Sequence, residues 1–269
     1  MSAGKKRALL DADFVIKAVI SQKDADHRLL DLLMENTAFD FYCHEKTLDE
    51  VSDHDVEGAS DWLRNKIETG KITMVSDAEI LAQLSTLFLS GANRRYRDYL
   101  KNSCEAFKKD YYDLTFASLE ALPTDVDDQT FLSELGKCET AIGRGKSLGE
   151  KKSLVLLQMF KDFYPEEVYL FCSDDGDARA GVVSFASDVK CLSFLSVFHL
   201  FYSHGLAQEE TEPYFASYEN YLAQRTGQTQ FKVYNQKGDT RLRVDCHQVF
   251  SEIYQGMYFD TKTGWLRYK

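Results

Sequence analysis

Short apolar segments alternate with amphipathic ones along the first 75 residues. The apolar run at 8–16 predicts a buried strand, interrupted by Asp11 and Asp13. Other elements predicted here are strands at 39–43 and 72–75 and helices at 25–35 and 60–68. This alternation is typical of an α/β sheet built from parallel units.

The strand pattern stops at residue 76, and apolar residues such as Ile80, Leu84 and Leu87 then recur on one helical face. We therefore predict a helical insertion over about 77–148. Further predicted elements are a helix at 149–163, a strand at 168–172, a helix near Ala178, a strand near Cys191 and a helix at 194–202. The whole pattern predicts a three-layer α/β/α fold with a central parallel sheet.

We place the end of the sheet domain, 1–205, near Gly205 and predict a small α+β extension over 206–269. The acidic residues 209–212 suggest a linker, and a helix is predicted at 214–224. Strand-like runs at 231–234 and 241–244 flank a glycine-containing turn and predict a hairpin.

Composition narrows the function classes. A net charge of −11 argues against a protein that coats nucleic acid non-specifically, because phosphate binding depends on Lys and Arg. No segment supplies the roughly 20 apolar residues of a membrane span, and the first residues lack a secretory signal pattern. The six cysteines form no C-x-x-C pair, which favours free thiols. We expect a cytoplasmic protein without a membrane partner.

Acidic residues follow two of the predicted strands. Asp11 and Asp13 lie in the first strand, and Asp174 and Asp175 follow the strand at 168–172. The carboxyl ends of parallel strands meet at one edge of a sheet, which is where α/β folds bind ligands. We expect both pairs to meet there.

Two glutamates near helix starts extend this acidic set. Glu50 follows the second strand, and Glu150 begins the helix before the strand at 168–172. Carboxylates gathered at one edge repel one another and raise their own pKa values unless a cation binds. Because the ligands are oxygens, Mg²⁺ or Mn²⁺ is the expected cofactor.

The motifs together resemble the PIN-domain nucleases. In that family an apolar strand ending in an aspartate opens the domain, as the LLDAD segment at 9–13 does, and a glutamate follows the second strand, as Glu50 does. A Gly-Glu pair then opens a helix, as at 149–150. A Ser-Asp-Asp triplet ends the next strand, as at 173–175, and an Ala-Arg pair follows it at 178–179.

The resemblance covers roughly 6–202 and implies a metal-dependent endoribonuclease acting on single-stranded RNA. It implies catalytic roles for Asp11, Glu50, Glu150, Asp174 and Asp175, metal ligation by Asp11, Glu150, Asp174 and Asp175, and supporting hydrogen bonds from Asp13, Ser173 and Asp177. Whether Asp174 or Asp175 is the inner ligand, and whether one or two metals bind, stays open. The long insertion and the residues after 205 depart from compact toxin-type members of the family.

Basic residues in the insertion suggest where RNA binds. They are Arg94, Arg95, Arg97 and Lys101, interleaved with aromatic residues. Single-stranded RNA stacks its bases and attracts cations with its backbone, although a solvated helix face explains the same pattern. The resemblance leaves room for a protein inhibitor or antitoxin, for a homodimer, and for a toxin–antitoxin or defence role.

Each carboxylate also has a structural interpretation. Glu50 completes a capping-box pattern with Thr47, and Glu150 suits the positive end of its helix. Asp174 and Asp175 suit a strand-to-helix turn with an N-cap.

Two other functions compete with the nuclease. One is a haloacid-dehalogenase-like phosphatase, using Asp11 and Asp13 with Lys151 or Lys152, although Phe14 continues an apolar run where that family has a small turn. The other is a non-catalytic PIN-like binding module. A catalytic site is expected to bind Mn²⁺ and to lose that binding with Asp11→Asn.

Overall fold

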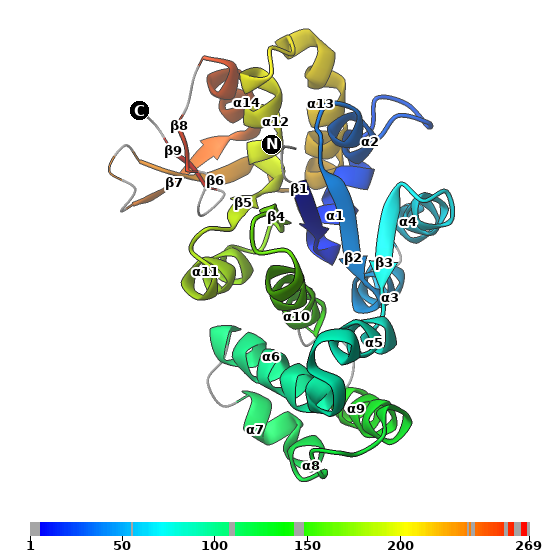
Figure 1. The fold of residues 1–269 in the computed structure, drawn as a ribbon. Helices are drawn as coiled ribbons and strands as arrows, with labels where there is room; N and C mark the ends of the chain where they lie inside the picture. The colour runs from blue at the N-terminus through cyan, green and yellow to red at the C-terminus, as the bar shows by residue number, and fades with distance from the viewer. Residues whose placement is uncertain are drawn as a thin grey trace.

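The computed structural model describes residues 6–54, 56–107, 111–142, 148–235, 237, 240–255, 258–260 and 265–267. At its centre is a sheet in which all five strands are parallel, in the order β3-β2-β1-β4-β5 (Figure 1). The strands are β1 (Lys6–Leu10), β2 (Asp40–His44), β3 (Ile72–Val75), β4 (Val168–Cys172) and β5 (Lys190–Leu192).

Helices cover both faces of this sheet, so the fold is the predicted three-layer α/β/α arrangement. Successive strand residues point to opposite faces, and Ala8 and Leu10 enter one hydrophobic core while Leu9 enters the other. The first core is built with α1 (Ala12–Ile20), α2 (Leu29–Glu35), α3 (Glu45–Asp53), α4 (Ala59–Glu68), α12 (Phe194–Ser203) and α13 (Gln208–Thr226).

The second core contains the helical insertion, which lies at the bottom of Figure 1. Its elements are α5 (Asp77–Phe88), η1 (Leu89–Gly91), α6 (Ala92–Phe107), α7 (Tyr111–Thr115), α8 (Ala117–Glu120) and α9 (Asp128–Ile142). Between insertion and sheet lies α10 (Leu148–Phe163), buried at nearly every position from Gly149 to Phe160, and α11 (Gly176–Phe185) follows β4. The predicted helical character of this region is confirmed.

The C-terminal residues form a second sheet, in the order β7-β6-β9-β8. Its elements are β6 (Gln230–Tyr234), β7 (Arg241–Asp245), α14 (Cys246–Tyr254), β8 (Tyr258–Asp260) and β9 (Trp265–Arg267). The pair β6 and β7 is antiparallel, as the predicted hairpin requires. Val233, Val244 and Phe250 pack into the first core, so this part shares its interior with the central sheet.

Two local predictions are wrong. Residues 8–16 are not one strand, because β1 ends at Leu10, Asp11 is an extended N-cap, and α1 begins at Ala12. The acidic residues 209–212 are not a linker but lie in the first turns of α13, where negative charge is favourable at the positive helix end. Within the described part of the chain, no helix is both long and apolar enough to cross a membrane.

Candidate functional site

Asp11 lies at the carboxyl end of the central strand. Its backbone N–H donates to the Cys172 carbonyl at 2.9 Å, which extends the pairing with β4 one residue past the end of β1. The side chain does not cap α1; instead its Oδ2 accepts a 2.8 Å hydrogen bond from Ser173 Oγ. With 1% exposure, the carboxylate is enclosed where the chain order of the sheet reverses between β1 and β4, the position at which open α/β sheets bind ligands.

Glu50 reaches this edge from α3, one turn after β2. Its Oε1 accepts a 2.9 Å hydrogen bond from the backbone N–H of Gly149, and a Cβ at residue 149 would lie 2.2 Å from Glu50 Oε2. Glycine is therefore what lets the start of α10 approach the carboxylate. The capping-box interpretation is wrong: His44 caps α3, and Thr47 donates to the Leu10 carbonyl.

Glu150 occupies the first turn of α10 beside Glu50. Its Oε2 is buried and has no hydrogen-bond partner among the residues that the structure describes. Burial, with the added charge of Glu50, raises the pKa of Glu150 from its ordinary 4.5 to about 7, although Lys151 acts in the opposite direction. The N–H groups at the start of α10 give Glu150 Oε2 no hydrogen bond, so the favourable helix end alone does not explain this residue.

The three carboxylates act on one another. Burial raises the pKa of Asp11 well above its usual range, and the charges of Glu150 and Glu50 raise it further, against the Ser173 hydrogen bond. Burial likewise raises the pKa of Glu50, although the Gly149 hydrogen bond lowers it. The structure thus brings Asp11, Glu50 and Glu150 within electrostatic reach of one another, and among the described residues the charges of Lys151 and His54 do not outweigh the effect of burial.

Asp175 lies at the rim of this group. It is the N-cap of α11, where its Oδ1 accepts from the N–H groups of Asp177 and Ala178 at 2.7 and 3.2 Å, so the N-cap interpretation is confirmed. Its charge also contributes to the raised pKa of Glu150. Asp177 is exposed in the first turn of α11, and Ser173 Oγ, besides donating to Asp11, accepts from the Asp175 N–H at 3.2 Å.

Asp174 turns to a different partner. Its Oδ2 lies 2.5 Å from Lys17 Nζ, which also pairs with Asp13 Oδ2 at 2.9 Å, and its Oδ1 accepts from the Phe194 N–H at 3.1 Å. Lys17 therefore neutralises Asp174 and Asp13 together. Of the doubled aspartates, the geometry favours Asp175 as the neighbour of Glu150.

The basic residues of the insertion divide into two groups. Arg97 is 6% exposed and donates to the carbonyls of Glu120, Leu122 and Pro123, so it does not fit the predicted RNA contact. Its guanidinium instead donates hydrogen bonds to backbone carbonyls at and just after the C-terminal end of α8.

Arg95 is bound to Asp162, at 3.0 and 2.6 Å from its Nε and Nη2. Arg94 and Lys101 are exposed on α6. Of the four predicted contacts, these two remain on the surface.

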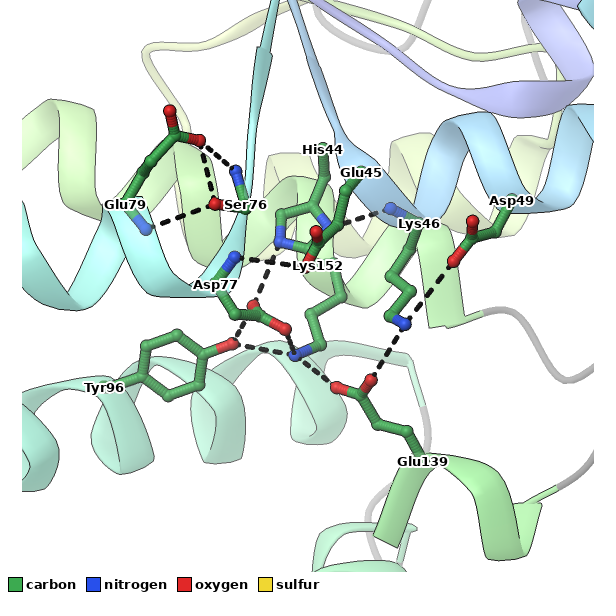
Figure 2. Close-up of polar contacts among 10 residues, drawn as sticks. All are labelled: His44, Glu45, Lys46, Asp49, Ser76, Asp77, Glu79, Tyr96, Glu139 and Lys152. Atoms are coloured by element: carbon green, nitrogen blue, oxygen red, sulfur yellow. Dashed lines mark hydrogen bonds and ion pairs between the residues drawn. The ribbon is translucent and has the colours of Figure 1, made fainter. Parts of the chain in front are cut away.

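A second polar cluster, which the sequence did not indicate, lies where the helical insertion meets α3 and α10 (Figure 2). There Asp77, at the start of α5, receives Lys152 Nζ at 2.8 Å and His44 Nε2 at 3.0 Å, with Tyr96 OH bonded to the same carboxylate. Lys152 also pairs with Glu139 at 2.5 Å. The pKa of Asp77 is held well below its usual range, because Lys152 and His44 outweigh the burial that raises it.

Among the described residues, three ligand atoms come within 4.8 Å of one another at His44, Glu45 and Asp77. This set is chemically satisfied as it stands. His44 Nδ1 accepts from the Lys46 N–H, so the ring proton on Nε2 faces Asp77, and Lys152 supplies the cation. The cluster is therefore a buried ion-pair network that joins α3, α5, α6, α9 and α10. The sequence gives little sign of it, because Lys152 directly follows Lys151 near the start of a helix that also carries Ser153 and Gln158.

The Asp11 group (Asp11, Glu50 and Glu150) is different, because burial still raises the pKa of all three carboxyl groups, although the charge of Lys151 lowers the pKa of Glu50 and Glu150. Its carboxylates do not bring three oxygens within 4.8 Å, but Mg²⁺ commonly keeps several waters and takes only one or two carboxylates directly. The unpartnered Glu150 Oε2 and the all-oxygen donor set fit such an ion. Comparison of the chain with protein families, with curated proteins and with solved structures found no match.

Proposed function

We propose that the protein is a metal-dependent, PIN-like endoribonuclease that hydrolyses phosphodiester bonds of single-stranded RNA with Mg²⁺ or Mn²⁺. The observation that carries the proposal is the uncompensated group of Asp11, Glu50 and Glu150 at the carboxyl edge of the sheet. Buried carboxylates that raise one another's pKa values are costly to a fold, and such cost is concentrated at functional sites.

The acidic side chains of the site would have different roles. Asp11, held by Ser173, and Glu150, with a free oxygen, would hold the ion, with Asp175 at the open rim. The bound ion would activate water and stabilise charge on the phosphate. Glu50, which accepts a hydrogen bond from the Gly149 N–H, would accept a proton from a water or orient it.

The phosphatase alternative fits less well. One of its two candidate lysines, Lys152, is fully buried against Asp77 and Glu139, and its candidate Asp13 is paired with Lys17. A non-catalytic module gives no reason to keep three buried carboxylates with raised pKa values together.

The test is incubation of purified protein with an end-labelled single-stranded RNA, with Mn²⁺ or with EDTA. We expect cleavage with Mn²⁺ only, and a loss of at least a hundredfold in Asp11→Asn. Asp61→Asn, which changes an exposed aspartate in α4, is the matched control and keeps full activity.

Electron paramagnetic resonance measures the binding of Mn²⁺, and together with the cleavage assay it separates the nuclease, the phosphatase and the binding module. Equal cleavage by Asp11→Asn and the parent would overturn the proposal. Intact RNA together with Asp11-dependent hydrolysis of an aryl phosphate would favour the phosphatase. Absence of both Mn²⁺ binding and cleavage would favour the binding module.

A further inference from the structure

A cavity of about 680 Å³ lies between the central domain and the C-terminal hairpin. It is lined by Lys17 of α1, Asp174 after β4, Tyr218 of α13, Lys232 of β6 and Arg243 of β7. Three of these side chains are cationic and one is anionic, in a chain whose net charge is −11. The cavity is therefore positive where the molecule as a whole is negative.

Lys232 and Arg243 stand directly opposite each other across the antiparallel pair β6 and β7. Both are exposed, and within the described part of the chain neither takes part in an ion pair. Like charges in directly opposed positions destabilise a β-ladder. An anion between them would remove this repulsion, so the pair is better explained by a ligand than by the fold.

The cavity lies beside a segment of the carboxylate site, because Asp174 lines it and follows Ser173, the residue bound to Asp11. Lys17 lines the cavity and also pairs with Asp174 and Asp13, and it lies in the helix that begins immediately after Asp11. A ligand that contacts both Lys232 and the Asp11 group must extend from one to the other. This length favours a strand over a mononucleotide.

We propose that this cavity, the cationic groove (Lys17, Lys232 and Arg243), holds the phosphodiester backbone of the single-stranded RNA that the carboxylate site cuts. The inference rests on the proposed function and gives the C-terminal hairpin its role. A positive groove that follows the backbone, without reading bases, is the common way in which single strands are bound.

The test measures binding apart from cleavage, as the fluorescence anisotropy of a labelled 12-nucleotide RNA in EDTA. We expect Lys232→Gln with Arg243→Gln to weaken binding at least tenfold. Because each phosphate contact contributes about 0.7 to the salt slope of single-strand binding, the slope should fall by about 1.4. The matched control is Lys71→Gln with Lys190→Gln, which are exposed at the amino ends of the two edge strands of the central sheet, and it stays within twofold of the parent.

Three results would overturn the groove: unchanged affinity in the groove variant, larger loss in Arg94→Gln with Lys101→Gln, or labelled AMP bound as tightly as the 12-mer. Thermal melting checks folding, and removing a like-charge pair should not lower the melting temperature. Groove-dependent binding without Mn²⁺-dependent cleavage would refute the nuclease alone. Cleavage with groove-independent binding would refute the groove alone.

Discussion

The backbone N–H of Gly149 donates a 2.9 Å hydrogen bond to Glu50 Oε1, across a separation of 99 residues. This bond joins the start of α10 to α3 and sets Glu150, the next residue, beside Glu50. It depends on the absence of a side chain at residue 149. The acidic group is therefore assembled by the close approach of two helices as well as by the ends of strands.

Gly149→Ala should weaken metal binding without unfolding the protein. The new Cβ would lie 2.2 Å from Glu50 Oε2, so the carboxylate must swing away and lose its hydrogen bond. Disturbing such supporting contacts costs roughly 10- to 100-fold in metal affinity. Titration with Mn²⁺ measures the loss, and Gly136→Ala in α9, where a Cβ meets nothing within 4 Å, is the control. Equal Mn²⁺ affinity in the two variants would show that the contact is incidental.

Glu150→Gln should stabilise the metal-free protein at pH 8. The pKa of Glu150 is raised to about 7, so folding favours its protonated form, and the penalty grows as pH rises from about 4.5 to 7. Removing the charge should add on the order of 1 to 3 kcal/mol to the free energy of unfolding at pH 8 and nothing at pH 4.

Urea unfolding at both pH values, without metal, measures this effect, and Glu68→Gln at the exposed end of α4 is the control. With Mn²⁺ present the order should reverse, because the parent gains a bound ion that the variant cannot hold. A variant less stable than the parent at pH 8 would contradict the uncompensated charge.

The sheet was predictable from the sequence because each strand is a compact apolar run bounded by polar residues. The strands at 72–75 and 168–172 match β3 and β4, and the other predicted strands after the first deviate by one residue or so. The first segment failed because the buried positions of α1, such as Phe14, Val15 and Ala18, continue the apolar run of β1 without a break. Periodicity alone does not separate a buried strand from a buried helix.

The site was predictable only where parallel strand ends impose proximity. That rule placed Asp11 near the Ser173 triplet, but it could not show that Lys17 pairs with Asp174 while the charge of Asp175 acts on Glu150. Nor could it show the Asp77 network, whose partners lie 33 and 75 residues from Asp77. Such contacts depend on how the insertion packs.

Arg97→Met should lower stability and leave RNA affinity unchanged. The guanidinium is buried and satisfies three carbonyls, so its loss leaves them unpaired, at about 1 to 3 kcal/mol for each buried group left without a partner. Arg94→Gln on the exposed face of the same helix is the control and should unfold like the parent. Urea unfolding and RNA anisotropy in parallel make the distinction. Weaker RNA binding by folded Arg97→Met would restore it as an RNA contact.

Lys152→Met should be among the most destabilising single changes in the chain, because it leaves Asp77 and Glu139 without their shared cation. Removing one partner from a buried ion pair costs about 3 to 5 kcal/mol. The low pKa of Asp77 means that its contribution to stability is present at neutral pH and is lost as pH falls through the acid range. The deficit of the variant should therefore shrink under acid conditions.

Urea unfolding from pH 7 down to pH 2 measures this deficit, because the contribution of Asp77 is lost only below its ordinary pKa of 3.8. Adding Asp77→Asn to Lys152→Met should recover part of the lost stability, since no buried carboxylate at residue 77 is then left unbalanced. The control is Lys161→Met, which breaks the more exposed pair with Asp188 and should cost less than about 1 kcal/mol. A Lys152→Met protein as stable as that control would mean that the network does not hold the insertion against the sheet, and that another cation can take the place of Lys152 beside His44 and Asp77.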